Sequence, residues 1–214
     1  MQETTTKEKI LKQVRNALIS TKENPFSGVD FSSSVYQDFE EDTVVQFALN
    51  LNETGGTFIY CENEKAVVEN MQILIEQQKW TKLFAIDESL ITLLKDGDFK
   101  LSNKPEEFNN LKVGITRCDY LIARFGSVMV SSALSSGRRM FVYPETHVVI
   151  AKASQVVNEL KDALNGIKKK YAGNFPSQIT VISGPSRTAD IEKTLVMGAH
   201  GPKALFVLMI DDLQ

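Results

Sequence analysis

The alternation of apolar and polar positions along this chain predicts an α/β protein. Between residues 57 and 97, short apolar runs that suit strands are followed by stretches with apolar residues at helical spacing. Thr57–Tyr60 and Lys82–Ile86 are the strand candidates, and Asn63 and Asp87 stand where each following helix would be capped. Strands and helices in this order are typical of parallel βαβ units.

The N-terminal quarter is predicted to be helical. Apolar residues recur every three or four positions over residues 6–20, and Asp42 can cap a second helix that a pair of glycines ends. Two helices alone bury too little apolar surface to fold by themselves. We therefore expect residues 1–55 to be a helical lead-in that packs on the main α/β domain, residues 56–214.

Short strand candidates follow each other closely in the middle of the chain. They are Tyr120–Ala123, Ser127–Ser131, Arg139–Tyr143 and His147–Ile150, and Gly, Ser and Pro residues separate them. This spacing suits hairpins, so we expect antiparallel strands added to the parallel core. Ser154 is then predicted to cap a helix whose apolar residues run to Ile167.

The C-terminal part carries two strand candidates with a polar segment between them. Ile179–Ile182 is a short apolar run, and Leu205–Ile210 is apolar without alternation, as expected for a strand covered on both faces. We expect these two strands to be parallel neighbours. The turn after the first strand would then open at the carboxyl edge of the sheet, where α/β proteins bind ligands.

Composition and charge exclude several classes of protein. The net charge of −3 gives no electrostatic footprint for nucleic acid, and no apolar run approaches the roughly 20 residues of a membrane span. The first residues lack an apolar secretory core, so a cytoplasmic protein is expected. The two cysteines and two histidines are far apart, which predicts no metal site and no cofactor site within this chain.

The polar segment between the last two strands holds the candidate site. A helix starting near Thr188 would offer unpaired N–H groups to an anion, and Arg187 would add a guanidinium suited to a carboxylate or a phosphate. His200 can carry a proton near neutral pH, and Asp190 can orient it or act as a base. The predicted substrate-binding residues are Ser183, Gly184, Ser186, Arg187 and Thr188, and the candidate catalytic residues are Asp190 and His200.

These residues also have structural interpretations, which stay open. A capped, ion-paired helix start without a ligand could be formed by Ser186, Arg187, Asp190 and Glu192. His200 could donate to a carbonyl and fix its loop. His147, in an apparent strand, is predicted to be a hydrogen-bonded structural histidine.

Two segments of the chain resemble a known family. The run Ser-Gly-Pro-Ser-Arg-Thr-Ala-Asp-Ile-Glu over residues 183–192 and the run Gly-Ala-His-Gly-Pro over 198–202 resemble the signature of the LUD (lactate-utilisation) domain family. The resemblance extends more loosely over residues 55–212, and length and lead-in are similar to its lactate-utilisation protein C branch. It departs at Arg124, where relatives often have an acidic residue.

The resemblance implies a fold and a role. The implied fold is a three-layer α/β fold with a mixed, mainly parallel sheet, similar to ribose-5-phosphate isomerases and CoA transferases. The implied role is that of a subunit without its own cluster, beside iron–sulfur subunits of a complex that oxidises L-lactate to pyruvate, with a lactate- or pyruvate-like anion as ligand. The alternative is a stand-alone isomerase or acyl/CoA-type transferase acting on a small anionic metabolite, with Asp190 and His200 as acid and base.

Overall fold

The chain divides into two units, Met1–Asp38 and Phe39–Gln214. The computed structural model describes residues 5–19, 26–30, 38–104, 106–107, 111–189, 195–198 and 200–213. The second helix that the sequence predicts, after Asp42, is α2 (Thr43–Glu53); it belongs to the second unit, where its residues Phe47 and Leu51 are fully buried.

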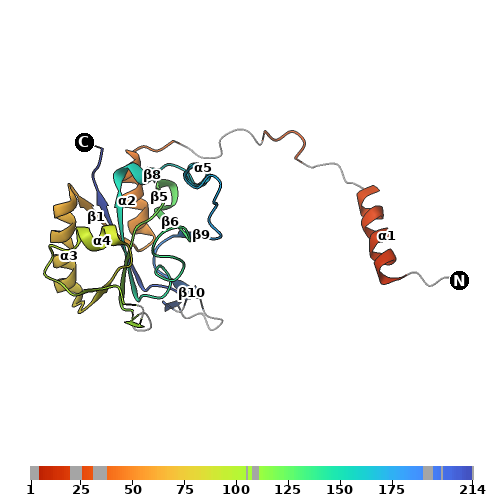
Figure 1. Ribbon diagram of the computed structural model, residues 1–214. Coiled ribbons are helices and arrows are strands. Elements are labelled where there is room, and N and C mark those ends of the chain that lie inside the picture. Colours follow the sequence, from red (N-terminus) through yellow and green to blue (C-terminus); the bar gives the residue numbers. More distant parts are fainter. Residues whose placement is uncertain are drawn as a thin grey trace. The chain divides into compact units, whose positions relative to one another are not determined.

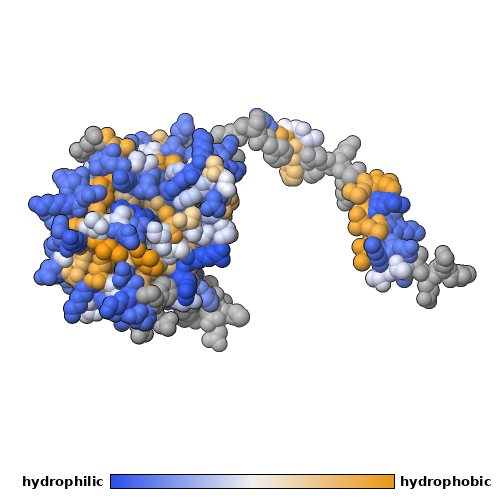
Figure 2. Space-filling model, in the orientation of Figure 1, coloured by the Kyte–Doolittle hydropathy of each residue, from blue (hydrophilic) through white to orange (hydrophobic). Residues whose placement is uncertain are grey.

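The first unit contains one amphipathic helix, α1 (Thr6–Ile19). Its start is a capping box, in which the backbone N–H of Thr5 donates to Glu8 Oε2 at 2.8 Å and the N–H of Glu8 donates to Thr5 Oγ1. Hydrophobic side chains gather along one side of α1 and hydrophilic ones along another (Figure 2). The predicted first helix is thus confirmed, while its packing on the main domain stays a prediction.

Six parallel strands form the main sheet of the second unit. In spatial order they are β1 (Thr57–Cys61), β12 (Ala204–Ile210), β7 (Thr146–Lys152), β4 (Val113–Thr116), β2 (Leu83–Phe84) and β3 (Leu101–Ser102). β12 lies between two neighbours, and its alternate side chains enter two separate cores on opposite faces. The prediction of an internal last strand buried on both faces is therefore confirmed.

Helices α3 (Glu64–Gln78) and α4 (Glu88–Leu93) cover one face of this sheet (Figure 1). The predicted caps form, since Asn63 accepts from the N–H of Ala66 and Asp87 accepts from the N–H of Ser89. Trp80, just after α3, packs edge-on against Phe206 with ring centroids 5.5 Å apart.

The other face is covered by α2 (Thr43–Glu53) and by a second sheet (Figure 1). The order in the second sheet is β8 (Val156–Val157), β5 (Tyr120–Ile122), β6 (Ser127–Ser131) and β9 (Ile179–Ile182). Helix α5 (Leu160–Lys170) packs on this sheet through Ala163 and Ile167. The described residues also form 3₁₀ turns, among them η2 (Ala123–Phe125) and η3 (Ala153–Gln155).

Two predictions about strand placement were wrong. β9 pairs antiparallel with β6 in the second sheet and is not a neighbour of β12. The antiparallel pairs lie in this separate sheet and do not extend the main one. The predicted strand at His147–Ile150 is part of β7, which is a parallel strand of the main sheet. Strand partners so distant in sequence leave no trace in local periodicity.

Two local predictions were also wrong. Residues 139–143 form turns and no strand, because the N–H groups of Val142 and Tyr143 both donate to the carbonyl of Arg139. The last helix begins at Leu160, because Val156 and Val157 pair with β5. Ser154 does not cap it, since its hydroxyl donates to Asp212 Oδ2 at 2.6 Å.

The predicted α/β class with a mainly parallel sheet is confirmed, with the second sheet in a place where many α/β folds have helices. No helix among the described residues combines the length and the apolar character that crossing a membrane requires.

Candidate functional site

The segment expected to start a helix forms a β-hairpin. β10 (Arg187–Ala189) pairs antiparallel with β11 (Leu195–Met197), with Arg187 opposite Met197. Thr188 therefore lies in a strand, and the predicted helix start near it is wrong, while the role of these residues in binding an anion stays a prediction. The extended pairing prevails because both strands can satisfy their backbone groups across the hairpin. Asp190 lies outside the described residues.

The two motif segments lie side by side before and after this hairpin. The N–H of Ser186 donates to the carbonyl of Pro202 at 2.8 Å, and the N–H of Gly198 donates to the carbonyl of Ser186 at 2.9 Å. A side chain at Gly201 would lie 3.2 Å from Ser186 Cβ. Residues far apart in sequence thus converge at one place, and their roles in binding or catalysis stay predictions.

This place lies at the amino edge of the main sheet, where its strands begin. The N–H of Lys203, just before β12, donates at 2.7 Å to the carbonyl of Glu145, just before β7. The expected position at the carboxyl edge is therefore wrong. The reason is that β9 belongs to the second sheet, so the turn after it meets the start of β12.

Arg187 and Gly184 hold the C-terminal end of α2, an arrangement that we call the α2 clamp. Arg187 Nη2 donates to the carbonyl of Thr54 at 2.7 Å. Gly184 has φ +79°, and a Cβ there would lie 2.3 Å from the same carbonyl oxygen. A cation at a helix C-terminus complements the helix dipole and the unpaired carbonyls. The contacts of Arg187 therefore favour the structural interpretation of this residue.

Ser183 joins two strands of the second sheet. Its hydroxyl lies 2.7 Å from Ser127 Oγ, which connects the end of β9 to the start of β6. Ser183, Gly184 and Arg187 thus all contact parts of the chain more than 50 residues away. Only Ser186, of the predicted binding residues whose side chains are described, lies beside the His200 loop.

His200 lines an open pocket at the amino edge. The pocket has a volume of about 610 Å³, and its walls come from Tyr143, Glu145, Gly198, Gly201 and Lys203 among others. The His200 side chain is exposed. Lys203 Nζ lies 3.7 Å from Glu145 Oε2, and since both side chains are more than half exposed this pair holds neither group firmly. Imidazole and ammonium groups are thus available to a small anion here.

His147 is the buried, hydrogen-bonded histidine that the sequence predicts. Its Nε2 lies 2.8 Å from Thr116 Oγ1, and it is fully buried between β4 and β12. Burial lowers the pKa of His147 to about 3, because the charged imidazolium would lose its hydration.

Stability should therefore depend on pH through His147. Because the folded-state pKa of about 3 lies below the ordinary value of 6.5, the unfolded chain binds a proton that the folded chain does not. The free energy of unfolding should fall as the pH drops from 6.5 toward 3, by up to about 1.4 kcal/mol per pH unit. The free energy of unfolding, measured by urea denaturation across this range, should depend on pH with a shallower slope for His147→Gln than for wild type. Equal slopes for His147→Gln and wild type would contradict this role.

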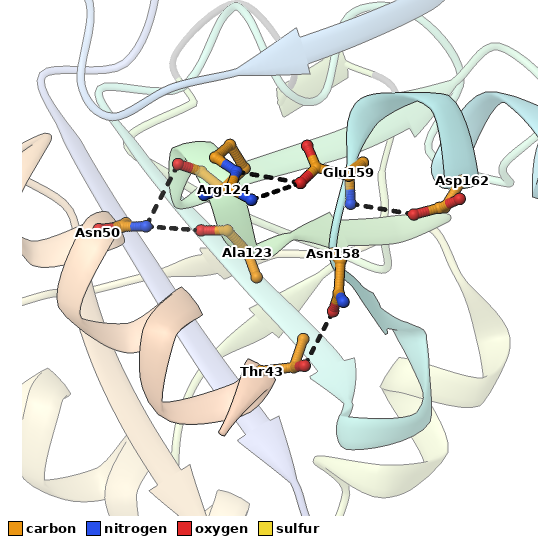
Figure 3. A network of polar contacts seen from close by, with 7 residues as sticks. All are labelled: Thr43, Asn50, Ala123, Arg124, Asn158, Glu159 and Asp162. Carbon is orange, nitrogen blue, oxygen red and sulfur yellow. Dashed lines mark hydrogen bonds and ion pairs between the residues drawn. The ribbon is translucent and has the colours of Figure 1, made fainter. Parts of the chain in front are cut away.

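Arg124 belongs to a polar network under α2 (Figure 3). Its Nε and Nη2 donate to Glu159 Oε1 at 3.0 and 2.7 Å. Its guanidinium also stacks on Phe39, 4.2 Å from the ring centroid. Asn50 of α2 donates to the carbonyls of Ala123 and Arg124, at 2.8 and 3.2 Å. The cation therefore joins η2 to the start of α5, and it does not line the His200 pocket.

The Arg124–Glu159 pair should be measurable as a coupling energy. Both side chains are about one-fifth exposed, so we expect Arg124→Gln and Glu159→Gln each to lower the free energy of unfolding by about 1 kcal/mol. The free energy of unfolding should fall by less in the double variant than the sum of the two single losses. The reason is that the second substitution removes a side chain whose ion-pair partner is already gone. Additive losses in denaturant titrations would show that the pair contributes nothing.

Both cysteines are packing residues. Cys61 and Cys118 are buried and unpaired, and burial raises the pKa of their thiols to about 11 and about 12. Within the described part of the chain, no three His, Cys, Asp or Glu side chains gather closely enough to hold a metal ion.

Sequence reasoning missed Arg117, which lies at the opposite edge of the main sheet. It follows β4, a strand that the sequence reading did not detect. The four apolar or small residues 113–116 directly before an arginine were the available signal.

Comparison with known proteins places these features in a family. Residues 44–210 match the LUD domain. The chain is 30% identical over 200 residues to lactate utilization protein C 1 of Bacillus mycoides, covering 88% of this chain and 84% of that protein. It is 38% identical over 111 residues to lactate utilization protein C of Bacillus subtilis, covering 50% of this chain and 45% of that protein. The matched region thus spans about half the length of several curated relatives.

A solved structure has the same fold. It is a crystal structure of a DUF162 family protein from Deinococcus radiodurans, with a TM-score of 0.59 and 13% identity, covering 78% of this chain and 96% of the other. The LUD domain matches most of the chain, and lactate utilization protein C 1 is similar to it along most of both chains. This chain therefore belongs to the LUD domain family.

Proposed function

We propose that this chain takes part in L-lactate utilisation as a cytoplasmic component without its own cluster, beside iron–sulfur proteins that oxidise L-lactate to pyruvate. The observation that carries the proposal is the similarity to lactate utilization protein C 1 along most of both chains. The oxidation releases two electrons and two protons, and the electrons would pass to the iron–sulfur partners.

The number and the burial of the cysteines support the proposal that this chain holds no iron–sulfur cluster of its own. A cluster held by cysteines needs four thiolates, whereas this chain has two cysteines. Both lie in apolar cores, and their raised pKa values keep them protonated. An iron–sulfur cluster held by four cysteines would therefore have to come from partner proteins.

The pocket at the amino edge is the proposed place for the metabolite. Lys203 would attract the carboxylate of a lactate-like anion, and Ser186 would lie beside it. His200 would carry the proton of the substrate hydroxyl, with Asp190 as the carboxylate that orients it. Gly184 and Arg187 would hold the pocket in place through the α2 clamp, Thr188 through the hairpin and Ser183 through its contact with Ser127.

The test compares the chain alone with the chain purified from its native host grown on L-lactate. We expect the native preparation to contain iron and to reduce an artificial electron acceptor when L-lactate is added, and the isolated chain to do neither. His200→Gln should lower this activity at least tenfold, while Lys161→Gln, on the exposed side of α5, should leave it unchanged. Turnover by the isolated chain would favour the stand-alone isomerase or transferase, and a native preparation without iron would overturn the proposal.

A further inference from the structure

A second cavity lies at the carboxyl edge of the main sheet, on the side opposite to the LUD motif. It has a volume of about 870 Å³ and opens between α3 and α4. β2 and β4 are neighbours in the sheet, but the chain leaves them toward opposite faces, to α4 after β2 and to the second sheet after β4. In open α/β sheets, such a switch point at the carboxyl ends of the strands is where ligands bind.

Arg117 reaches this cavity from the end of β4. The Arg117 side chain is partly buried, and this burial lowers its pKa. The negative charges of Asp87 and Glu64 raise the pKa, but their effect is smaller than that of burial. Among the described residues it forms no ion pair, and the hydrogen bond recorded for it is a long one of 3.5 Å to Ser89 Oγ. A guanidinium has five N–H donors arranged for bidentate contact with a carboxylate or phosphate. Most of these donors remain available at the cavity wall.

The rest of the wall restricts which anions fit. Four carboxylates, from Glu64, Glu69, Glu88 and Asp96, face two cations, Arg117 and Lys65. Lys65 is highly exposed and lies 3.8 Å from Glu69. A polyanion would meet net repulsion, whereas hydroxyl or ammonium groups would find acceptors on the carboxylates. The volume lies within the usual range of about 300–1,000 Å³ for metabolite pockets and is larger than a three-carbon acid needs.

We propose that the carboxyl-edge cavity binds a metabolite with one carboxylate or phosphate group and several hydroxyl or ammonium groups. Arg117 holds the anionic group, with Ser89 beside it. The acidic residues of α3 and α4 accept hydrogen bonds from the hydroxyl or ammonium groups. The site is separate from the His200 pocket and does not rest on the function proposed above.

The test is calorimetric titration of the full chain with defined probes. Ribose 5-phosphate and L-lysine represent the two sources of this chemistry, a hydroxylated phosphate and an acid with two ammonium groups, and inorganic phosphate and acetate are the bare anions. We expect one of the first two to bind more tightly than either bare anion. Arg117→Gln should weaken that binding at least tenfold. Arg138→Gln, on a turn outside the lining, should leave it unchanged.

A second variant controls for the case in which Arg117→Gln disturbs folding and loses binding for that reason. Gln72 is an exposed residue of α3 at the cavity, so Gln72→Trp should narrow the cavity without disturbing the core. It should weaken binding while the thermal melt stays that of wild type. His200→Gln should not affect binding, which separates this site from the proposed lactate site. Absence of binding below about 10 mM for both probes, or unchanged binding by Arg117→Gln, would overturn the proposal.

Discussion

Phe47→Ala is expected to lower the free energy of unfolding by about 3–5 kcal/mol. Phe47 is fully buried on α2 and packs edge-on against Phe58 of β1, with ring centroids 6.0 Å apart. It belongs to the core between the main sheet and the second sheet, so its removal leaves a cavity where α2, β1 and the second sheet meet. Urea denaturation followed by circular dichroism measures the loss.

Val45→Ala is the matched control on the same helix. Val45 is 44% exposed, so its truncation should change the free energy of unfolding by less than about 1 kcal/mol. Similar small losses for both variants would mean that α2 does not contribute to the core. The comparison thus tests whether the domain includes the second predicted helix or begins after it.

Gly126→Ala is expected to lower the free energy of unfolding by roughly 2–5 kcal/mol, from two separate effects. Gly126 has φ +56°, a conformation unfavourable to residues with a side chain by about 1–2 kcal/mol. An added Cβ would also lie 2.1 Å from the backbone N of Leu51 and 2.3 Å from the carbonyl carbon of Asn50. Because these are backbone atoms of α2, the helix itself would have to move.

Gly137→Ala separates the two effects. Gly137 has a similar φ of +60°, but no atom lies within 4 Å of the position that its Cβ would take. Its loss should be limited to the conformational part, about 1–2 kcal/mol. Thermal or urea denaturation of both variants gives the difference that is due to contact with α2. Equal losses would show that α2 does not press against the turn at Gly126.

Local signals in the sequence were sufficient for much of the fold. Asp42, Asn63 and Asp87 predict helix starts correctly, because a cap bonds N–H groups only two or three residues away. The run Leu205–Ile210 predicts burial on both faces because a parallel strand between two neighbours has no polar side. Where structure depends on contacts within one element, the amino-acid pattern is enough.

Some strands were missed or predicted wrongly because their pairing partners are distant in sequence. Val156 and Val157 fit a helical pattern, but pairing with Leu121 and Ile122 makes them a strand. β4 is four residues long and includes Gly114, which fits closely against Pro144 and gives no signal for a strand in the sequence. The sheet to which each strand belongs is a property of the whole chain.

The same distinction applies to the candidate site. The motif marks residues that meet, because Ser186 bonds both Gly198 and Pro202. It does not reveal that Arg187 reaches Thr54, which is 133 positions away in sequence. It also gives no indication of Arg117, which lies outside the motif at the other edge of the sheet.

The position of β12 determines when the protein can fold during synthesis. β1 has β12 as its neighbour in the main sheet, with Thr57 opposite Phe206. β1 can therefore form these backbone hydrogen bonds only after β12 has been synthesised and has left the ribosome. At about 5–20 residues per second, the nascent chain exposes the apolar face of β1 and α3 for several seconds. The second sheet likewise waits for β9 to pair with β6. Each sheet therefore closes only after its last strand has been synthesised, and nascent-chain chaperones have their longest opportunity to bind on the first strand.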